Sequence, residues 1–149
     1  MSNEILVARQ RLIDGGYACV LLHDGEECTS FERGVKPLIA FLKSGKTFGG
    51  FVAADKTVGA GAAHLYVLLG IRALWANVIS TSALEILKNN GIDASYGECV
   101  PHIINRRGDG VCPIEMAVAA AGTSEEAYDL ILDALARLAS SAERAEQSS

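Results

Sequence analysis

The chain of 149 residues has no long hydrophobic run and few aromatic side chains. No stretch reaches the ~20 uninterrupted apolar residues that a membrane-spanning helix needs. The segment Met1–Glu4 also lacks the basic residues and the following apolar run of a secretion signal. These absences predict a cytoplasmic protein with no membrane partner.

Clusters of basic residues are absent as well. The 13 Lys and Arg residues are scattered along the chain, and with 18 Asp and Glu the net charge is −5. Nucleic-acid binding draws most of its affinity from clustered Lys and Arg. We therefore expect no nucleic-acid partner.

Cysteines are few and widely spaced. Cys19, Cys28, Cys99 and Cys112 form no C-x-x-C pair. Structural zinc sites are normally assembled from closely spaced Cys and His pairs, and the same scarcity argues against a disulfide framework. The sequence predicts no metal site and implies no resident cofactor.

What the chain does contain is enough apolar sequence for a conventional core. Half of its residues are hydrophobic and 21% are charged, which is the composition of a folded domain. We expect a single α/β domain over residues 1–139, followed by a polar, frayed tail over residues 140–149.

The spacing of apolar residues and of Gly and Pro predicts alternating elements. Asp24 and Gly25 suit a tight turn between two antiparallel strands, and the later strand–helix alternation indicates parallel strands. The predicted helices cover residues 4–14, 35–42, 60–69, 82–89, 113–121 and 123–138, and the predicted strands 17–22, 28–31, 48–54, 73–79 and 92–96. Ile5, Ala8, Leu12 and Ile13 form the apolar stripe of the first helix. The segment 60–69 is apolar all round and needs cover on every side, so we expect a homo-oligomer, most simply a dimer.

Polar residues gather where the predicted strands end. Ligands of open parallel sheets bind outside the carboxyl ends of the strands. That rule brings together four loops: Asp55 and Lys56 with Gly59 and Gly61, then Ser80 and Thr81, then Asn105 and Arg106, and finally Cys112 to Glu115. We expect a small-molecule ligand there.

The residue types in these loops favour an anionic or nucleotide-like ligand. Lys56 and Arg106 are cationic, and a helix start beside Gly59 and Gly61 can present backbone N–H groups to a phosphate. Each feature has a plainer structural alternative. Asp55 and Lys56 could form a solvated turn, and the glycines could allow close packing of a helix on the sheet.

Cys112 and His64 leave a catalytic alternative open. A thiol at a helix start followed by Pro113 would have a lowered pKa, whereas Glu115 opposes the thiolate and is also the cap partner of the same helix. His64 lies in an apolar helix, either as a satisfied core histidine or as a base. Three hypotheses follow: a small-molecule-binding protein, a metal-independent enzyme with Cys112 as nucleophile and His64 or Asp55 as base, and a non-catalytic assembly subunit.

Three segments carry a family resemblance: Ala54–Ala63, Asn105–Arg106 and Cys112–Glu115. They resemble the uncharacterised family called domain of unknown function 1893, and the similarity runs from about Ile5 to about Leu138. That family is grouped with the cytidine-deaminase-like proteins. The resemblance implies a three-layer α/β/α sheet with an N-terminal antiparallel hairpin and following parallel strands.

The deaminase resemblance does not extend to zinc chemistry. Zinc deaminases carry H-x-E at one helix start and P-C-x-x-C at the next. The helix starts after Gly59 and after Ser80 contain neither motif. A hydrolytic zinc deaminase is therefore not expected.

Overall fold

The computed structural model describes residues 3–32, 34–104, 110 and 112–147. Its elements alternate between helices and strands in the predicted order. They are α1 (Asn3–Gly15), β1 (Cys19–His23), β2 (Glu26–Ser30), α2 (Lys36–Lys43), β3 (Val52–Val58), α3 (Ala60–Leu69), β4 (Ala73–Ser80), α4 (Thr81–Asn89), β5 (Asp93–Val100), α5 (Pro113–Val118) and α6 (Ser124–Gln147).

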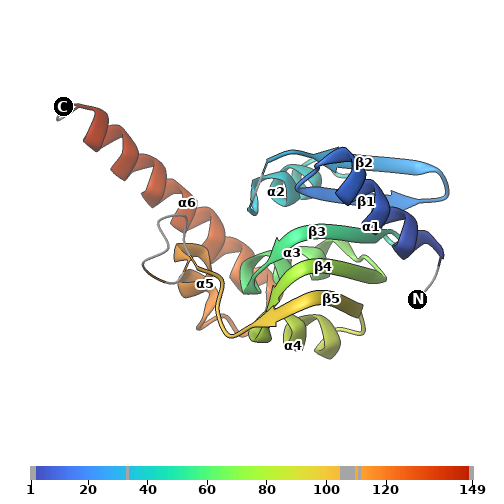
Figure 1. Cartoon of the computed structure of the whole chain (residues 1–149). Coiled ribbons are helices and arrows are strands. Elements are labelled where there is room, and N and C mark those ends of the chain that lie inside the picture. The colour runs from blue at the N-terminus through green and yellow to red at the C-terminus, as the bar shows by residue number, and fades with distance from the viewer. Residues whose placement is uncertain (1–2, 33, 105–109, 111, 148–149) are drawn as a thin grey trace.

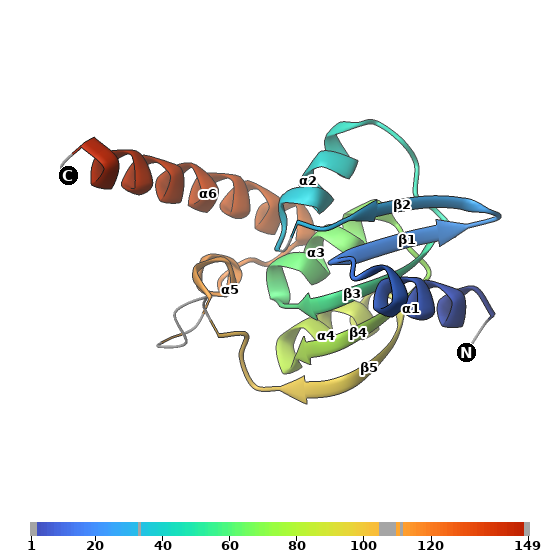
Figure 2. The same ribbon diagram turned by 45° about the horizontal axis from the view of Figure 1, so that its top comes forward.

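The strands form one mixed sheet in the order β2-β1-β3-β4-β5. β1 pairs antiparallel with β2 and β3, while β3, β4 and β5 run parallel. α1 covers one face of the sheet, and α2, α3 and α4 lie on the other (Figures 1 and 2). The predicted three-layer α/β/α architecture, with a hairpin followed by parallel strands, is confirmed.

The hairpin turn forms where the sequence predicts it. Asp24 and Gly25 have φ angles of 48° and 81°. Positive φ at both central residues is typical of the two-residue turn whose twist matches that of the flanking strands. His23 and Glu26 consequently face each other as the first pair of the β1–β2 ladder.

Each face of the sheet has its own hydrophobic core. Side chains alternate along a strand, so Val52 of β3 packs against α1 whereas the adjacent Ala53 packs on the α3 side. Ile5, Ala8 and Leu12 of α1 are buried as predicted. Ile13 is not, with 55% of its surface exposed, because it falls beside the narrow stripe that touches the sheet.

α3 has the predicted bounds and is the most enclosed helix. It follows Gly59 and ends at Gly70, whose φ of 80° is the left-handed conformation common at helix ends. α3 packs against α2, α4 and α6, so most of its side chains are buried within one chain. A second copy of the chain is therefore not needed to cover the apolar surface of α3. The homo-oligomer stays a prediction, but the apolar surface of α3 no longer supports it.

β3 begins four residues later than the sequence indicates. A turn precedes it, with Gly50 at φ 85° and a hydrogen bond from the Phe51 N–H to the Phe48 carbonyl. The strand consequently includes Asp55 and Lys56. The prediction that these two residues form a loop after the strand is wrong.

α4 also starts differently from the prediction. The helix begins at Thr81, one residue before the predicted start, because Ser80 caps it: the Ser80 Oγ accepts a hydrogen bond from the Ala83 N–H at 3.2 Å. β4 continues to Ser80, which places the cap at the carboxyl end of that strand. The strand and helix therefore meet with no intervening loop.

α6 is a long helix whose second half projects away from the sheet (Figures 1 and 2). It begins as predicted, with the Thr123 Oγ1 accepting the Glu126 N–H at 3.1 Å. It continues to Gln147, into the segment for which the sequence predicts a frayed tail, and the fraying stays a prediction. Within the described residues, no helix is long and apolar enough to cross a membrane.

Candidate functional site: a groove among the helices

Asp55 lies in the core, away from any loop. Its side chain is 7% exposed, and its Oδ2 accepts a hydrogen bond of 2.6 Å from the Tyr66 hydroxyl of α3. Its Oδ1 accepts the Thr57 N–H at 3.1 Å. Burial raises the pKa of Asp55 to about 7, although these hydrogen bonds oppose the rise. The contacts of Asp55 hold β3 and α3 together, and its carboxyl group is enclosed by the core.

The carboxyl group of Asp55 also affects a neighbouring thiol. Cys19 of β1 is the direct partner of Asp55 across the ladder. Burial, with a smaller contribution from the negative charge of Asp55, raises the pKa of the Cys19 thiol. Cys19 therefore stays protonated and acts as a small hydrophobic residue.

Lys56 points to the opposite face of the sheet from Asp55. It lines a smaller pocket of about 430 Å³ together with Trp75 and Asn77. This pocket lies beside the end of α1. The predicted pair of Asp55 and Lys56 is therefore divided between two faces of the sheet.

The predicted anion site at the start of α3 is occupied by a side chain of the protein itself. The Glu115 Oε1 accepts a hydrogen bond from the Ala60 N–H at 2.9 Å. A carboxylate at this position satisfies a free N–H group of the helix and interacts favourably with its dipole. The role predicted for Glu115, as the cap of its own helix, is therefore not the contact that the structure shows.

Gly59 and Gly61 make room for α5. A Cβ at Gly61 would lie 2.5 Å from Cγ2 of Ile114, and a Cβ at Gly59 would overlap the Glu115 carboxylate. These contacts support the structural alternative for the two glycines: they allow another element to approach α3 closely. The neighbour that approaches is α5 rather than the sheet.

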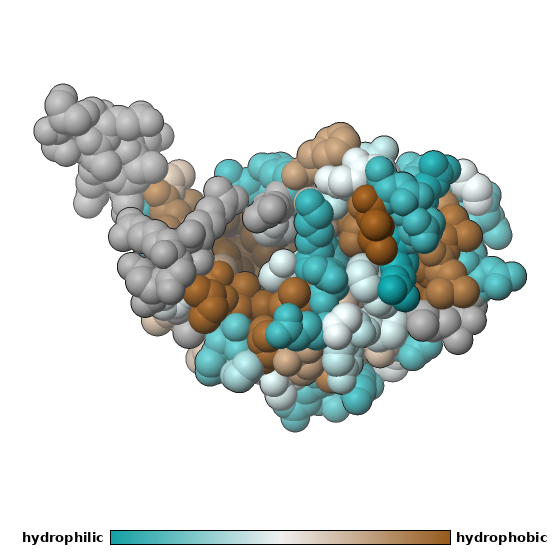
Figure 3. Space-filling model, viewed as in Figure 1, coloured by the Kyte–Doolittle hydropathy of each residue, from teal (hydrophilic) through white to brown (hydrophobic). Residues whose placement is uncertain are grey.

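A groove of about 1050 Å³ lies between α3, α4, α5 and the start of α6, and it extends along α4 to Asn89 and Asn90. Its lining includes His64, Glu85, His102, Glu115 and Ser124. Hydrophobic side chains gather on the face that carries α1, around α5 and the end of β5 (Figure 3). Of the predicted site residues that the structure describes, His64 and Glu115 are among the residues that line the groove, and the other predicted residues are not.

His64, like Glu115, is a predicted site residue that lines this groove and has a polar partner. Its Nδ1 is 3.0 Å from the Ser124 Oγ, and its side chain is 9% exposed. Burial lowers the pKa of His64 below its ordinary value of 6.5, so the imidazole is neutral at neutral pH. Ser124 was not predicted as a site residue, because a serine at a helix start has no local feature that connects it with a histidine 60 residues away.

The remaining predicted site residues lie in different parts of the structure, and two of them lie outside its described residues. Ser80 caps α4, and the Thr81 hydroxyl donates to the Val100 carbonyl at 3.2 Å. Cys112 is the half-buried N-cap residue of α5 with no side-chain capping hydrogen bond, and it is not among the groove-lining residues. Asn105 and Arg106 lie outside the described residues.

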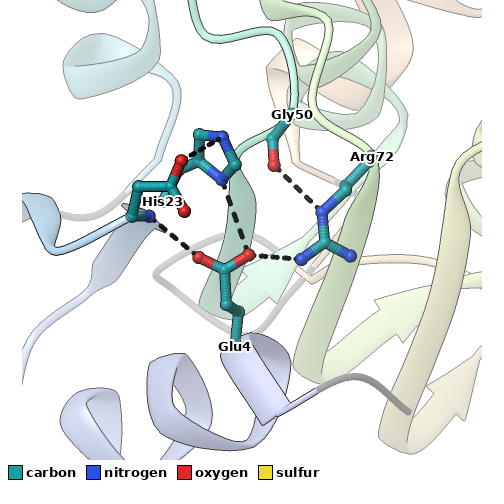
Figure 4. Close-up of polar contacts among 5 residues, drawn as sticks. Glu4, His23, Gly50 and Arg72 are labelled. Carbon is teal, nitrogen blue, oxygen red and sulfur yellow. Dashed lines mark hydrogen bonds and ion pairs between the residues drawn. The ribbon is translucent and has the colours of Figure 1, made fainter.

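A second polar cluster lies at the opposite end of the sheet, among Glu4, His23, Asp24 and Arg72 (Figure 4). The Arg72 guanidinium pairs with Glu4 and donates to the Gly50 carbonyl at 3.0 Å. Hydrogen bonds from Asp24 and Arg72 lower the pKa of Glu4. Glu4, His23 and Asp24 have metal-ligand atoms within 4.8 Å of one another, but the adjacent guanidinium already supplies the positive charge. The cluster ties α1 to the loops before β3 and β4.

The fold and groove together define a three-layer α/β protein with a groove among the helices on one side of its sheet. The model of the family described as a domain of unknown function, DUF1893, matches residues 7–135. The chain belongs to this family, and the predicted resemblance is confirmed. No curated protein matches the chain.

Two solved structures are similar to this fold. The crystal structure of a DUF1893 family protein, TM1506 from Thermotoga maritima, superimposes with a TM-score of 0.80 at 24% identity, covering 92% of each chain. A dCMP deaminase from the cyanophage S-TIM5 has a TM-score of 0.47 at 11% identity, covering 64% of this chain and 99% of the other.

Proposed function

We propose that this protein binds a small polar molecule in the groove between α3, α4, α5 and the start of α6. The observation that carries the proposal is the groove itself, which is about 1050 Å³ and combines apolar walls with side chains that can form hydrogen bonds. Ligand sites in proteins are typically concave, mostly apolar and furnished with a few polar groups.

The charge of the groove changes the class of ligand that we expect, because the sequence had favoured an anionic or nucleotide-like molecule. Its acidic lining residues are Glu85, Glu115 and Glu125, and Lys and Arg do not occur among the described residues that line it. A phosphate would be repelled there, and the start of α3 already carries the Glu115 carboxylate. A nucleoside-like ligand, with a neutral or basic heterocycle and hydroxyl groups, suits this lining better than a nucleotide.

The cysteine-enzyme alternative receives less support from the contacts. Asp55 is hydrogen-bonded to Tyr66 in the core, and His64 to Ser124 in the groove. Neither of the two proposed bases has a described contact with Cys112. The assembly alternative is supported by the half of α6 that projects beyond α3 and α5 (Figure 1).

A thermal-shift panel tests the binding proposal. We expect nucleosides and heterocyclic bases to raise the melting temperature, because a ligand at 100 times its Kd adds about 2.7 kcal/mol of stability. Nucleotides and small acids should have weaker effects. If nucleotides instead raised the melting temperature more than the corresponding nucleosides, the ligand would be anionic, as the sequence suggested.

A matched pair of variants locates the binding. Ala119 lines the groove, so Ala119→Trp should abolish the shift by filling it. Ala136 lies on the exposed side of α6, away from the groove lining, and Ala136→Trp should preserve the shift. The absence of any shift in the unmodified protein would contradict the proposal and favour the assembly role.

A further inference from the structure

A serine and a histidine from distant parts of the chain meet inside the groove. The Ser124 Oγ and the His64 Nδ1 are 3.0 Å apart, which is within the range for proton transfer between a nucleophile and its base. Both residues line the groove. We propose that Ser124 is a nucleophile that accepts an acyl group, with His64 as its general base; this inference rests on the groove being the ligand site.

The state of His64 suits this role. Burial lowers its pKa, so the ring is uncharged at neutral pH and has a free lone pair. When Nδ1 accepts the hydrogen bond from the Ser124 hydroxyl, the ring proton is on Nε2. His64 comes from the enclosed helix α3 and Ser124 from the first turn of α6, so both are held on regular elements rather than on loops.

The start of α6 offers a place for the negative charge that forms during acyl transfer. The Thr123 Oγ1 takes the Glu126 N–H, and the Glu126 carboxylate takes the Gly122 N–H at 3.2 Å. The N–H groups of Ser124 and Glu125 lie in the first turn, where a helix has no internal acceptors. The N–H of the residue after a nucleophilic serine commonly stabilises the oxyanion, and Glu125 occupies that position.

The reaction proceeds in two balanced steps. As the Ser124 Oγ bonds to the acyl carbon, its proton passes to the His64 Nδ1; the bond to the leaving group then breaks, and that proton goes to the departing alcohol or amine. Water next gives a proton to His64 and attacks the acyl-serine. The acid is released and the proton returns to the Ser124 Oγ, so water is the only co-reactant.

The lining of the groove indicates the substrate class. The carboxylates of Glu85, Glu115 and Glu125 disfavour an anionic substrate. A neutral or positively charged ester or amide of metabolite size fits the groove. An acylated nucleoside-like molecule belongs to this class, but the proposed acyl transfer does not require that the substrate contain a nucleoside.

Labelling with a fluorophosphonate tests the nucleophile directly. The reagent phosphorylates an activated serine and releases fluoride. We expect one label per chain, located at Ser124 by peptide mass spectrometry, with a rate that rises with pH as His64 loses its proton and then levels off. Ser124→Ala should remove the label, and His64→Gln should slow labelling by about 100-fold. Ser44→Ala is the control and should leave the labelling unchanged, because Ser44 is an exposed serine at the end of α2 that donates to the Phe41 carbonyl and does not line the groove.

A second variant covers the case in which His64→Gln does not fold. In Ser124→Cys, the introduced thiol beside His64 should be alkylated with a midpoint well below the free value of about pH 8.5. An unlabelled wild-type protein, labelling unchanged in Ser124→Ala, or an alkylation midpoint at the free value would overturn the proposal. If nucleosides still raised the melting temperature in that case, the protein would bind a ligand in the groove without Ser124 acting as a nucleophile. Failure of the catalytic proposal can therefore be distinguished from failure of the binding proposal.

Discussion

Asp55 shows at the residue scale how burial converts an ordinary carboxyl group into a determinant of stability. Its pKa rises from 3.8 to about 7 because the core removes it from water. The folded protein therefore binds this proton more tightly than the unfolded chain does. The contribution of Asp55 to stability is full below about pH 4 and is lost as the pH rises to about 7, after which it is constant.

The first prediction follows from this sign. The free energy of unfolding of the wild type, relative to Asp55→Asn, should fall by up to about 4 kcal/mol between pH 4 and pH 8. Urea denaturation at several pH values measures the difference between the two proteins, and Asp93→Asn, at an exposed residue of β5, is the matched control. The prediction would be contradicted if the wild type and Asp55→Asn differed in their free energy of unfolding by the same amount at pH 4 and at pH 8.

The contact between α3 and α5 is the decisive feature at the element scale. α5 is short, and it reaches α3 at the positions where α3 has no side chains. Glu115 closes the start of α3, while Ile114 packs over Gly61. The glycine and the isoleucine therefore form a matched pair, and their effects on stability should not be additive.

This pair gives the second prediction. Gly61→Ala should destabilise the wild type by about 1–3 kcal/mol, because the new methyl group would overlap Ile114. In an Ile114→Ala background the same change should stabilise the protein by up to about 1 kcal/mol, since alanine is the better helix former. Gly49→Ala, where a Cβ meets nothing within 4 Å, is the control. Chemical denaturation of the four proteins measures the change of sign, and equal effects in both backgrounds would refute it.

At the scale of the whole molecule, α6 is the element with the least cover. Its first half packs against α3 and α5, and its second half projects beyond them (Figure 1). Leu138 is 45% exposed on this helix, one turn after Ala134, which is buried. A half-helix with a partly exposed apolar stripe gains stability by pairing with another helix. A second copy of α6 is the partner that the predicted dimer would supply.

The third prediction concerns this association. Light scattering at micromolar concentration should give the mass of a dimer. Leu138→Glu should weaken the association at least about 10-fold, because a charge would replace a leucine that the dimer would bury. Ala136→Glu, on the exposed side of α6, should leave the mass unchanged. A monomer mass for the wild type would exclude the dimer.

Several elements could be predicted because their causes are local. The run of apolar residues between Gly59 and Gly70 gives α3 its bounds, and Asp24 with Gly25 gives the hairpin its turn. The cap of α6 is also local, because it joins Thr123 to Glu126 only three positions later. The family resemblance and the three-layer architecture follow from the order of such elements.

The errors arose where polar residues stand inside a strand. Asp55 and Lys56 are typical of loops by composition, yet β3 includes them because β1 and β4 pair with it on both sides. Ser80 and Ser82 are equally good capping residues, and the length of β4 decides between them. In both cases the pairing of strands overrides local preference.

The site was decided almost wholly by tertiary structure. The sequence alone determined that the starts of α3 and α4 would lie at the same edge of the sheet, because parallel strands end at the same edge. It could not determine that Glu115 caps α3 across 55 residues or that His64 meets Ser124 across 60. Those contacts depend on how α5 and α6 pack against α3. That packing is set by the combined shape of buried side chains rather than by the spacing of residues along the chain.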